Sequence, residues 1–263
     1  GGNFVCDVSN FMNTCKPMTH SVLDTHEFSI GDGMPGSQNY KTFVADAYAA
    51  MRLTFDYLWR VHGRQGLDGN NGPRIPIETR SPEMAGNAEW LKDKNRIIVA
   101  PDDVDHYDYA SFDVIAHEIG HGLDSYGPKM VVVPPPPCQE TNKIMEATAD
   151  MFSMLASASI EPSGHPYRIM EHPQKANWNA STFTSNVAER YLDDPTINNK
   201  PACYSQFIAC MNGHAGSSPA SHMFYLLAYG GTSACNGNAV NGIGIDIARD
   251  LFDQMFFQEL PPS

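Results

Sequence analysis

The stretch His117-Glu118-Ile119-Gly120-His121 combines residue types that can hold a metal ion and move a proton. On a helix, two histidines four positions apart lie about one turn apart on the same face, so both rings can reach one ion. Such a pair binds Zn²⁺, and the glutamate between them can act as general base on a metal-bound water. The spacing therefore predicts a zinc helix, with His117 and His121 as ligands and Glu118 as the general base.

Two acidic residues further along, Glu146 and Asp150, also stand one helical turn apart. Glu146 can supply a third, anionic ligand, which leaves one tetrahedral position open, as in catalytic zinc sites. Asp150 can accept a hydrogen bond from the non-ligating ring nitrogen of a zinc histidine and so orient that ring. The alternative is a pair of amphipathic helices with solvated side chains. Glycines on both sides of His121 and apolar neighbours of Glu146 argue against it.

The elements that must position these residues follow from hydrophobic periodicity. Apolar residues three or four apart predict helices over residues 40–62, 111–125, 142–158, 220–229 and 245–259. Residues 1–40 and 73–104 are irregular or β-like, with a strand expected at 96–100. The pattern predicts an α+β protein with a β-rich N-terminal lobe at 1–124 and a mainly helical C-terminal lobe at 125–263. The zinc helix lies at their junction.

Size and composition narrow the class of protein. The chain has 263 residues, 42% of them hydrophobic, and a formal charge of −13. This charge argues against nucleic acid or an anionic membrane as partner. No apolar run of membrane-spanning length is present. Six cysteines favour disulfides and a secreted protein over buried thiols. Local pairs, Cys6–Cys15 and Cys203–Cys210, are preferred among about 15 possible pairings.

Several segments besides the zinc motif resemble the thermolysin-like metallopeptidases. They are residues 57–71, 87–90, 113–122, 167–173, 212–217, 224–228 and 242–244. The resemblance spans most of the chain from residue 40 onward. It implies a two-lobed fold and a secreted zinc endopeptidase that holds one catalytic zinc and cleaves protein or peptide substrates. We expect a monomer.

The resemblance also assigns roles by position. Asn87 and Arg168 match residues that bind substrate, and His214 matches a histidine that stabilises the oxyanion. Taken singly, these could be a turn asparagine, a surface arginine and a loop histidine. Their order around a zinc site favours the functional roles, because a developing oxyanion needs a donor or cation opposite the metal.

The chain departs from the family in several places. Met145 replaces the usual asparagine before the zinc glutamate, and Asn212 stands where an acid normally orients the oxyanion histidine. Calcium is an open alternative as a second metal. Asp113 matches a calcium ligand, Glu161 is a nearby acid, and the acidic loop at 102–108 offers oxygens that suit a hard cation. Acidic loops are also commonly just solvated.

Two other functions remain open at this point. A zinc aminopeptidase shares the histidine motif and a downstream glutamate, but it needs a carboxylate pair to hold a free amino terminus, and none is clearly placed. A non-catalytic binding or toxin-like module on a degenerate peptidase scaffold is the other. Retention of Glu118 counts against it, because a metal-binding scaffold needs no general base.

Overall fold

The computed structural model of the protein describes residues 4–7, 16–17, 40–72, 75–79, 84, 86–100, 109–126, 140–160, 166–169, 188–206 and 211–257. The chain divides into two compact units. Unit 1 comprises residues 1–122 and 170–188, and unit 2 comprises residues 123–169 and 189–263.

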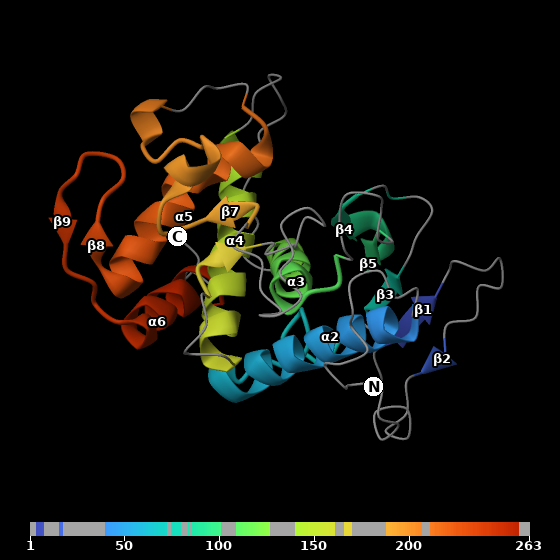
Figure 1. Ribbon diagram of the computed structural model, residues 1–263. Coiled ribbons are helices and arrows are strands. Elements are labelled where there is room, and N and C mark those ends of the chain that lie inside the picture. The colour runs from blue at the N-terminus through green and yellow to red at the C-terminus, as the bar shows by residue number, and fades with distance from the viewer. Residues whose placement is uncertain are drawn as a thin grey trace. The chain divides into compact units, whose positions relative to one another are not determined.

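Unit 1 contains a five-stranded sheet with the order β2-β1-β3-β5-β4 (Figure 1). The strands are β1 (Phe4–Asp7), β2 (Lys16–Pro17), β3 (Pro76–Thr79), β4 (Ala88–Leu91) and β5 (Arg96–Val99). The central strands β1, β3 and β5 are parallel, whereas β2 and β4 pair antiparallel at the two edges. A short 3-10 turn, η1 (Lys92–Lys94), and Asn95 in the left-handed region connect β4 to β5. The segment at 87–90 therefore supplies an edge strand.

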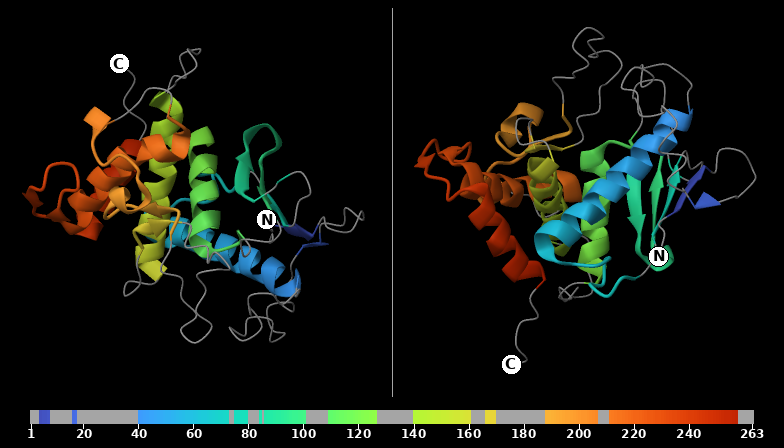
Figure 2. Two further views of the ribbon diagram at one scale, coloured as in Figure 1. Left: turned by 45° about the horizontal axis from the view of Figure 1, so that its top comes forward. Right: turned by 90° about the horizontal axis from the view of Figure 1, so that it is seen from below.

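The long helix α2 (Tyr40–His62) has the bounds that its apolar spacing predicts. It packs against β1 and β3, as two views in Figure 2 show. Ala47, Met51 and Leu58 on its inner face are fully buried. The helix ends at Gly63, whose φ of 63° is left-handed and favours glycine.

Helix α3 (Phe112–Tyr126) carries the zinc motif and begins after Ser111, whose carbonyl accepts a hydrogen bond from the Ile115 amide at 3.0 Å. Its apolar residues Val114, Ile115 and Ile119 are fully buried. Near the C-terminal end of the motif, Gly122 packs directly on Leu67, because a Cβ placed there would lie 2.8 Å from Leu67 Cδ1. Glycine at 122 therefore meets a packing requirement.

Unit 2 is built mainly from three helices, α4 (Glu140–Ile160), α5 (Gly213–Tyr229) and α6 (Ile245–Phe256). Phe252 of α6 packs against Phe152 of α4 and Phe224 of α5, with ring centroids 6.4 and 6.2 Å apart. Two small antiparallel pairs complete the unit: β6 (Arg168–Ile169) with β7 (Arg190–Tyr191), and β8 (Gly231–Thr232) with β9 (Ala239–Val240). Two 3-10 turns, η3 (Pro195–Asn198) and η4 (Tyr204–Gln206), follow β7.

Helix α5 begins seven residues earlier than its periodicity predicts, so that expectation was wrong. Asn212 caps it, since its side-chain oxygen accepts a hydrogen bond from the Ala215 amide at 2.7 Å. Glycine, serine and Pro219 disfavour a helix in isolation. Packing on α4 overrides this local preference. The cap also gives Asn212 a structural task.

A disulfide in unit 2 joins Cys203 and Cys235, which are 32 residues apart. The predicted pair Cys203–Cys210 was therefore wrong. Nearness along the chain did not decide the partner of Cys203. Cys235 lies in the turn between β8 and β9, and this turn contacts the residue directly before η4. The side chains of the other four cysteines lie outside the described residues.

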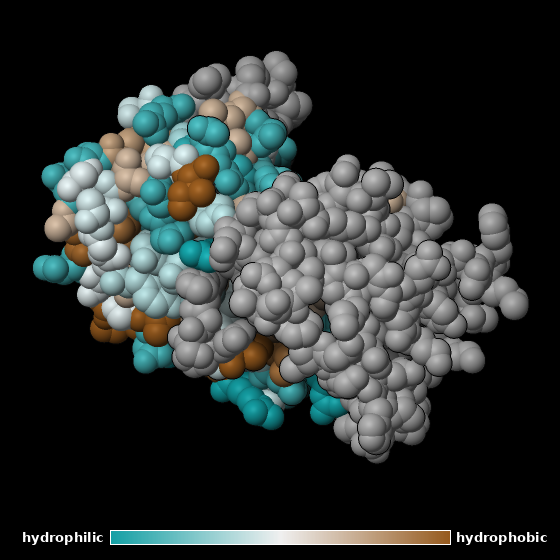
Figure 3. All heavy atoms as spheres, viewed as in Figure 1, coloured by the Kyte–Doolittle hydropathy of each residue, from teal (hydrophilic) through white to brown (hydrophobic). Residues whose placement is uncertain are grey.

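The described surface shows no extended apolar face in the view of Figure 3, where hydrophobic residues form small patches among hydrophilic ones. Within the described ranges, no helix is long and apolar enough to cross a membrane.

Candidate active site

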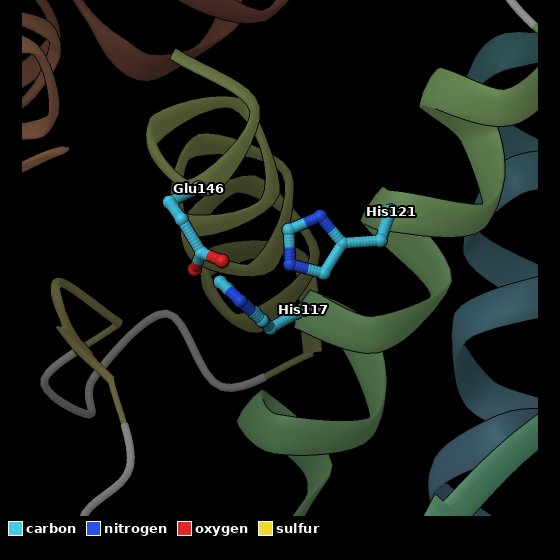
Figure 4. A group of neighbouring side chains, drawn as sticks. All are labelled: His117, His121 and Glu146. Atoms are coloured by element: carbon cyan, nitrogen blue, oxygen red, sulfur yellow. The ribbon is translucent and has the colours of Figure 1, made fainter. Parts of the chain in front are cut away.

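The two histidines of α3 project from one face of the helix. His117 is 1% exposed, and its ring lies edge-on to that of the half-buried His121, with centroids 4.7 Å apart. Glu146 projects from α4, and the three side chains point toward one another (Figure 4). Their ligand atoms all lie within 4.8 Å of one another. The structure thus brings together the three residues predicted as zinc ligands.

The donor set of this group fits zinc. Two imidazole nitrogens and one carboxylate oxygen are the ligand types of many catalytic zinc sites, with bonds of about 2.0–2.2 Å. This spacing lets all three atoms approach one central ion with small side-chain adjustments. Three protein ligands leave a fourth tetrahedral position for water or substrate.

Glu118 lies beside this group, on the helical turn between the two histidines. Its side chain is buried, and its Oε2 accepts a hydrogen bond from the backbone amide of Trp90 at 2.7 Å. Trp90 belongs to the edge strand β4. This hydrogen bond holds the carboxylate in one orientation, as a group that must accept a proton from a fixed position requires.

His214 lies in the first turn of α5, where a loop was expected. Its Nε2 is 3.2 Å from Oε2 of Glu146, and its side chain is 39% exposed. The helix start therefore brings His214 to the carboxylate of the predicted zinc ligand. His214 stands outside the three-residue group that the described residues form.

Asp150 is completely buried one turn after Glu146. Its Oδ1 accepts a hydrogen bond from Nε of Arg190 at 2.8 Å, and its Oδ2 accepts one from the Ser221 hydroxyl at 3.2 Å. These contacts join α4, β7 and α5. The hydrogen bond from a zinc histidine to Asp150 stays a prediction.

Sequence reasoning missed Arg190, whose side chain is only 2% exposed. Burial works to lower its pKa, but the charges of Asp150, Glu146 and Glu189, together with the Asp150 hydrogen bond, raise the pKa above its ordinary value. Arg190 therefore stays charged inside the unit. A single arginine on a two-residue strand belongs to no hydrophobic pattern from which its burial could be predicted. The one hint was Asp150 itself, since a buried acid calls for a cationic or hydrogen-bonding partner.

The two residues predicted to bind substrate lie in β6 and directly before β4. Arg168 is half-buried in β6, and its guanidinium carbon lies 5.6 Å from the centre of the Tyr191 ring. Asn87 directly precedes β4, and its carbonyl accepts a hydrogen bond from the Ala100 amide at 2.8 Å. Neither contact tests a role in substrate binding, so both roles stay predictions.

The calcium expectation also stays open. Asp113 lies in the first turn of α3, where a carboxylate is favoured by the helix dipole. Glu161 and the acidic loop at 102–108 fall outside the described residues.

Comparison with known proteins decides the family. Residues 6–125 match the model of the thermolysin metallopeptidase catalytic domain, and residues 139–262 match that of the thermolysin metallopeptidase alpha-helical domain. The chain belongs to the thermolysin family of metallopeptidases. The resemblance inferred from the sequence motifs is thereby confirmed, and the α+β fold class is confirmed with it.

Individual members of the thermolysin family are distant relatives. The chain is 28% identical over 226 residues to the transglutaminase-activating metalloprotease of Streptomyces mobaraensis, covering 80% of this chain and 28% of that protein. It is 28% identical over 238 residues to a thermostable neutral protease of Geobacillus stearothermophilus. That match covers 86% of this chain and 39% of the neutral protease. It thus spans well under half the length of these curated relatives.

A solved structure shows the same fold. The precursor of protealysin, a metalloproteinase from Serratia proteamaculans, matches with a TM-score of 0.60 at 16% identity. The match covers 86% of this chain and 67% of that chain. The thermolysin fold therefore persists in this chain although few residues are shared.

Proposed function

We propose that the protein is a secreted, zinc-dependent endopeptidase. The observation that carries this proposal is the group of His117, His121 and Glu146, whose ligand atoms lie within 4.8 Å of one another beside the buried, oriented carboxylate of Glu118. A site that only held a metal would not need a carboxylate at this position. Family membership and relatives named as proteases support the same conclusion.

Each residue has a task in peptide hydrolysis. Zinc, when bound, supplies a Lewis acid that lowers the pKa of a water and polarises a carbonyl. Glu118 accepts a proton from the attacking water and delivers it to the leaving amine nitrogen. His214 donates a hydrogen bond to the oxygen on which negative charge develops. Asp150 orients a histidine ring, and Arg190 balances the charge of Asp150.

The surroundings of the site suggest how a substrate is held. Asn87 precedes the edge strand β4, and an extended peptide can pair with such an edge. We assign Asn87 and Arg168 to substrate backbone groups. The negative charge and the Cys203–Cys235 disulfide support an extracellular location, since disulfides persist in oxidising compartments. The two family matches support a two-domain division near residues 124–125.

The test compares the protein with a Glu118→Gln variant at equal bound zinc. Internally quenched peptides with blocked amino termini are the substrates. We expect the parent protein to cleave them internally and the variant to lose about 10²–10⁴-fold in kcat, because the amide accepts no proton. Equal zinc content, measured on both proteins, separates lost chemistry from lost metal.

Two outcomes would point to the other functions. Cleavage confined to peptides with a free amino terminus, one residue at a time, would indicate an aminopeptidase. If neither protein cleaved a broad peptide set despite bound zinc, the binding-module alternative would replace the proposal.

A further inference from the structure

Two glycines at the start of α5, Gly213 and Gly216, lie directly against side chains of α4. A Cβ placed on Gly216 would lie 2.5 Å from Cδ of Lys143 and 2.8 Å from its Cγ. A Cβ on Gly213 would lie 3.1 Å from Cγ of Glu146. Carbon atoms of different residues essentially never approach to 2.5 Å, so a methyl group at position 216 would require the Lys143 stem to shift.

The backbone does not explain why glycine occupies position 216. Gly216 lies within α5 and is not among the described glycines with positive φ, so an alanine could adopt its conformation. Glycine also weakens a helix relative to alanine. The requirement for glycine is therefore the space that Lys143 occupies.

Lys143 fills this space with the carbon stem of its side chain. The residue is buried, although lysine is rarely buried, and its Cγ, Cδ and Cε all face Gly216. Lysine stems pack well as apolar groups. The stem therefore acts as a spacer between the two helices.

The contact adjoins the proposed site on both helices. Lys143 precedes Glu146 by three residues, about one turn of α4, and Gly216 follows His214 by two residues on α5. Lys143 and Gly216 therefore pack against each other within one turn of Glu146 and His214. The Nε2 of His214 and the Oε2 of Glu146 are 3.2 Å apart. We infer that Lys143 and Gly216 are a size-matched pair of positioning residues for His214. The catalytic consequence rests on the proposed peptidase function.

A structural experiment tests the inference without using activity. Crystal structures of the parent protein, Gly216→Ala and Lys143→Ala/Gly216→Ala would give the separation of His214 Nε2 and Glu146 Oε2. We expect a longer separation in the single variant and the parent value in the double variant, where the new methyl takes the space of the lost stem. An unchanged separation in Gly216→Ala would overturn the inference.

A kinetic experiment tests the consequence for catalysis. We expect Gly216→Ala to lower kcat about ten- to hundredfold with little change in KM, because small misplacements of a catalytic group reduce the rate more than binding. The Lys143→Ala/Gly216→Ala variant should recover kcat. In a His214→Ala background, Gly216→Ala should cause no further loss. Met223→Ala, on the exposed face of α5, serves as the matched control and should keep the parent kcat.

The outcomes separate this inference from the proposed function. A parent protein without peptidase activity would contradict the proposed function, while the interatomic separations would still decide the positioning role. If Gly216→Ala does not fold, recovery of folding in the Lys143→Ala/Gly216→Ala variant would support the size match. Failure of both variants to fold would contradict it, as would a further loss of kcat in the His214→Ala background.

Discussion

Arg190 and Asp150 form an ion pair in the interior of unit 2, with side chains 2% and 0% exposed. Two charges withdrawn from water are costly unless both are paired and hydrogen-bonded. Here the Ser221 hydroxyl donates a hydrogen bond to the second carboxylate oxygen of Asp150. The pair therefore specifies how β7 and α5 meet α4, next to the carboxylate of Glu146.

Removing one member of this pair should destabilise the protein strongly. We expect Arg190→Met to lower the free energy of unfolding by about 3–5 kcal/mol, because it leaves Asp150 buried without its cation. Urea unfolding monitored by circular dichroism measures the change. The control is Arg249→Met in α6, where the ion pairs with Asp246 and Asp250 lie at the surface and contribute about 1 kcal/mol or less. Equal losses in the two variants would contradict the assigned role.

At the scale of elements, helix α3 packs closely against the loop that follows α2, and this packing leaves no space for a side chain at Gly122. Leu67 is fully buried in the loop after α2. Its Cδ1 would lie only 2.8 Å from a Cβ placed on Gly122. Gly122 follows the second histidine of the zinc motif. The loop therefore supports the helical turn that carries His121.

A methyl group at position 122 should disturb this packing. We expect Gly122→Ala to lower the free energy of unfolding by about 1–3 kcal/mol, because the buried Leu67 cannot move aside without strain. Thermal unfolding measures the loss. Combined with Leu67→Ala, the same substitution should cost less than the sum of the two single changes. Additive losses would show that the two residues do not interact.

Elements with a strong periodic pattern were predictable from the sequence. Helix α2 spans the predicted residues because its apolar positions recur every three or four residues and Gly63 ends it. The grouping of His117, His121 and Glu146 was also predictable, because their spacing places them on two such helices. The start of α5 was not predictable, because glycines and Pro219 disfavour a helix that tertiary packing nevertheless forms. Arg190 and the partner of Cys203 depend on contacts between distant segments, which leave no local pattern.

For the whole molecule, the strand-rich part and the helical part match two separate family models. The disulfide Cys203–Cys235 lies wholly within the second part, and the chain between its ends includes α5 and His214. Closing this loop restricts the unfolded chain, which is the main way in which a disulfide stabilises a protein.

Loss of the disulfide should therefore lower stability, while His117, His121 and Glu146 lie outside the loop that it closes. For a loop of 32 residues, we expect Cys203→Ser/Cys235→Ser to lower the free energy of unfolding by about 3–4 kcal/mol. Calorimetry of the variant and of the parent protein measures this. A reductant should therefore lower the unfolding temperature of the parent protein more than that of the variant, which has already lost this bond. A variant as stable as the oxidised parent would contradict the expectation.

The same covalent ring bears on self-digestion, a hazard that follows from the proposed endopeptidase activity when the protein is stored at high concentration. A backbone cut anywhere between Cys203 and Cys235 opens the ring but leaves both pieces attached through sulfur. Nicked molecules would keep the mass of one chain, apart from an added water, until a reductant separates them. The segment that contains His214 can thus be cut once and still remain tethered to the helices that hold it in place.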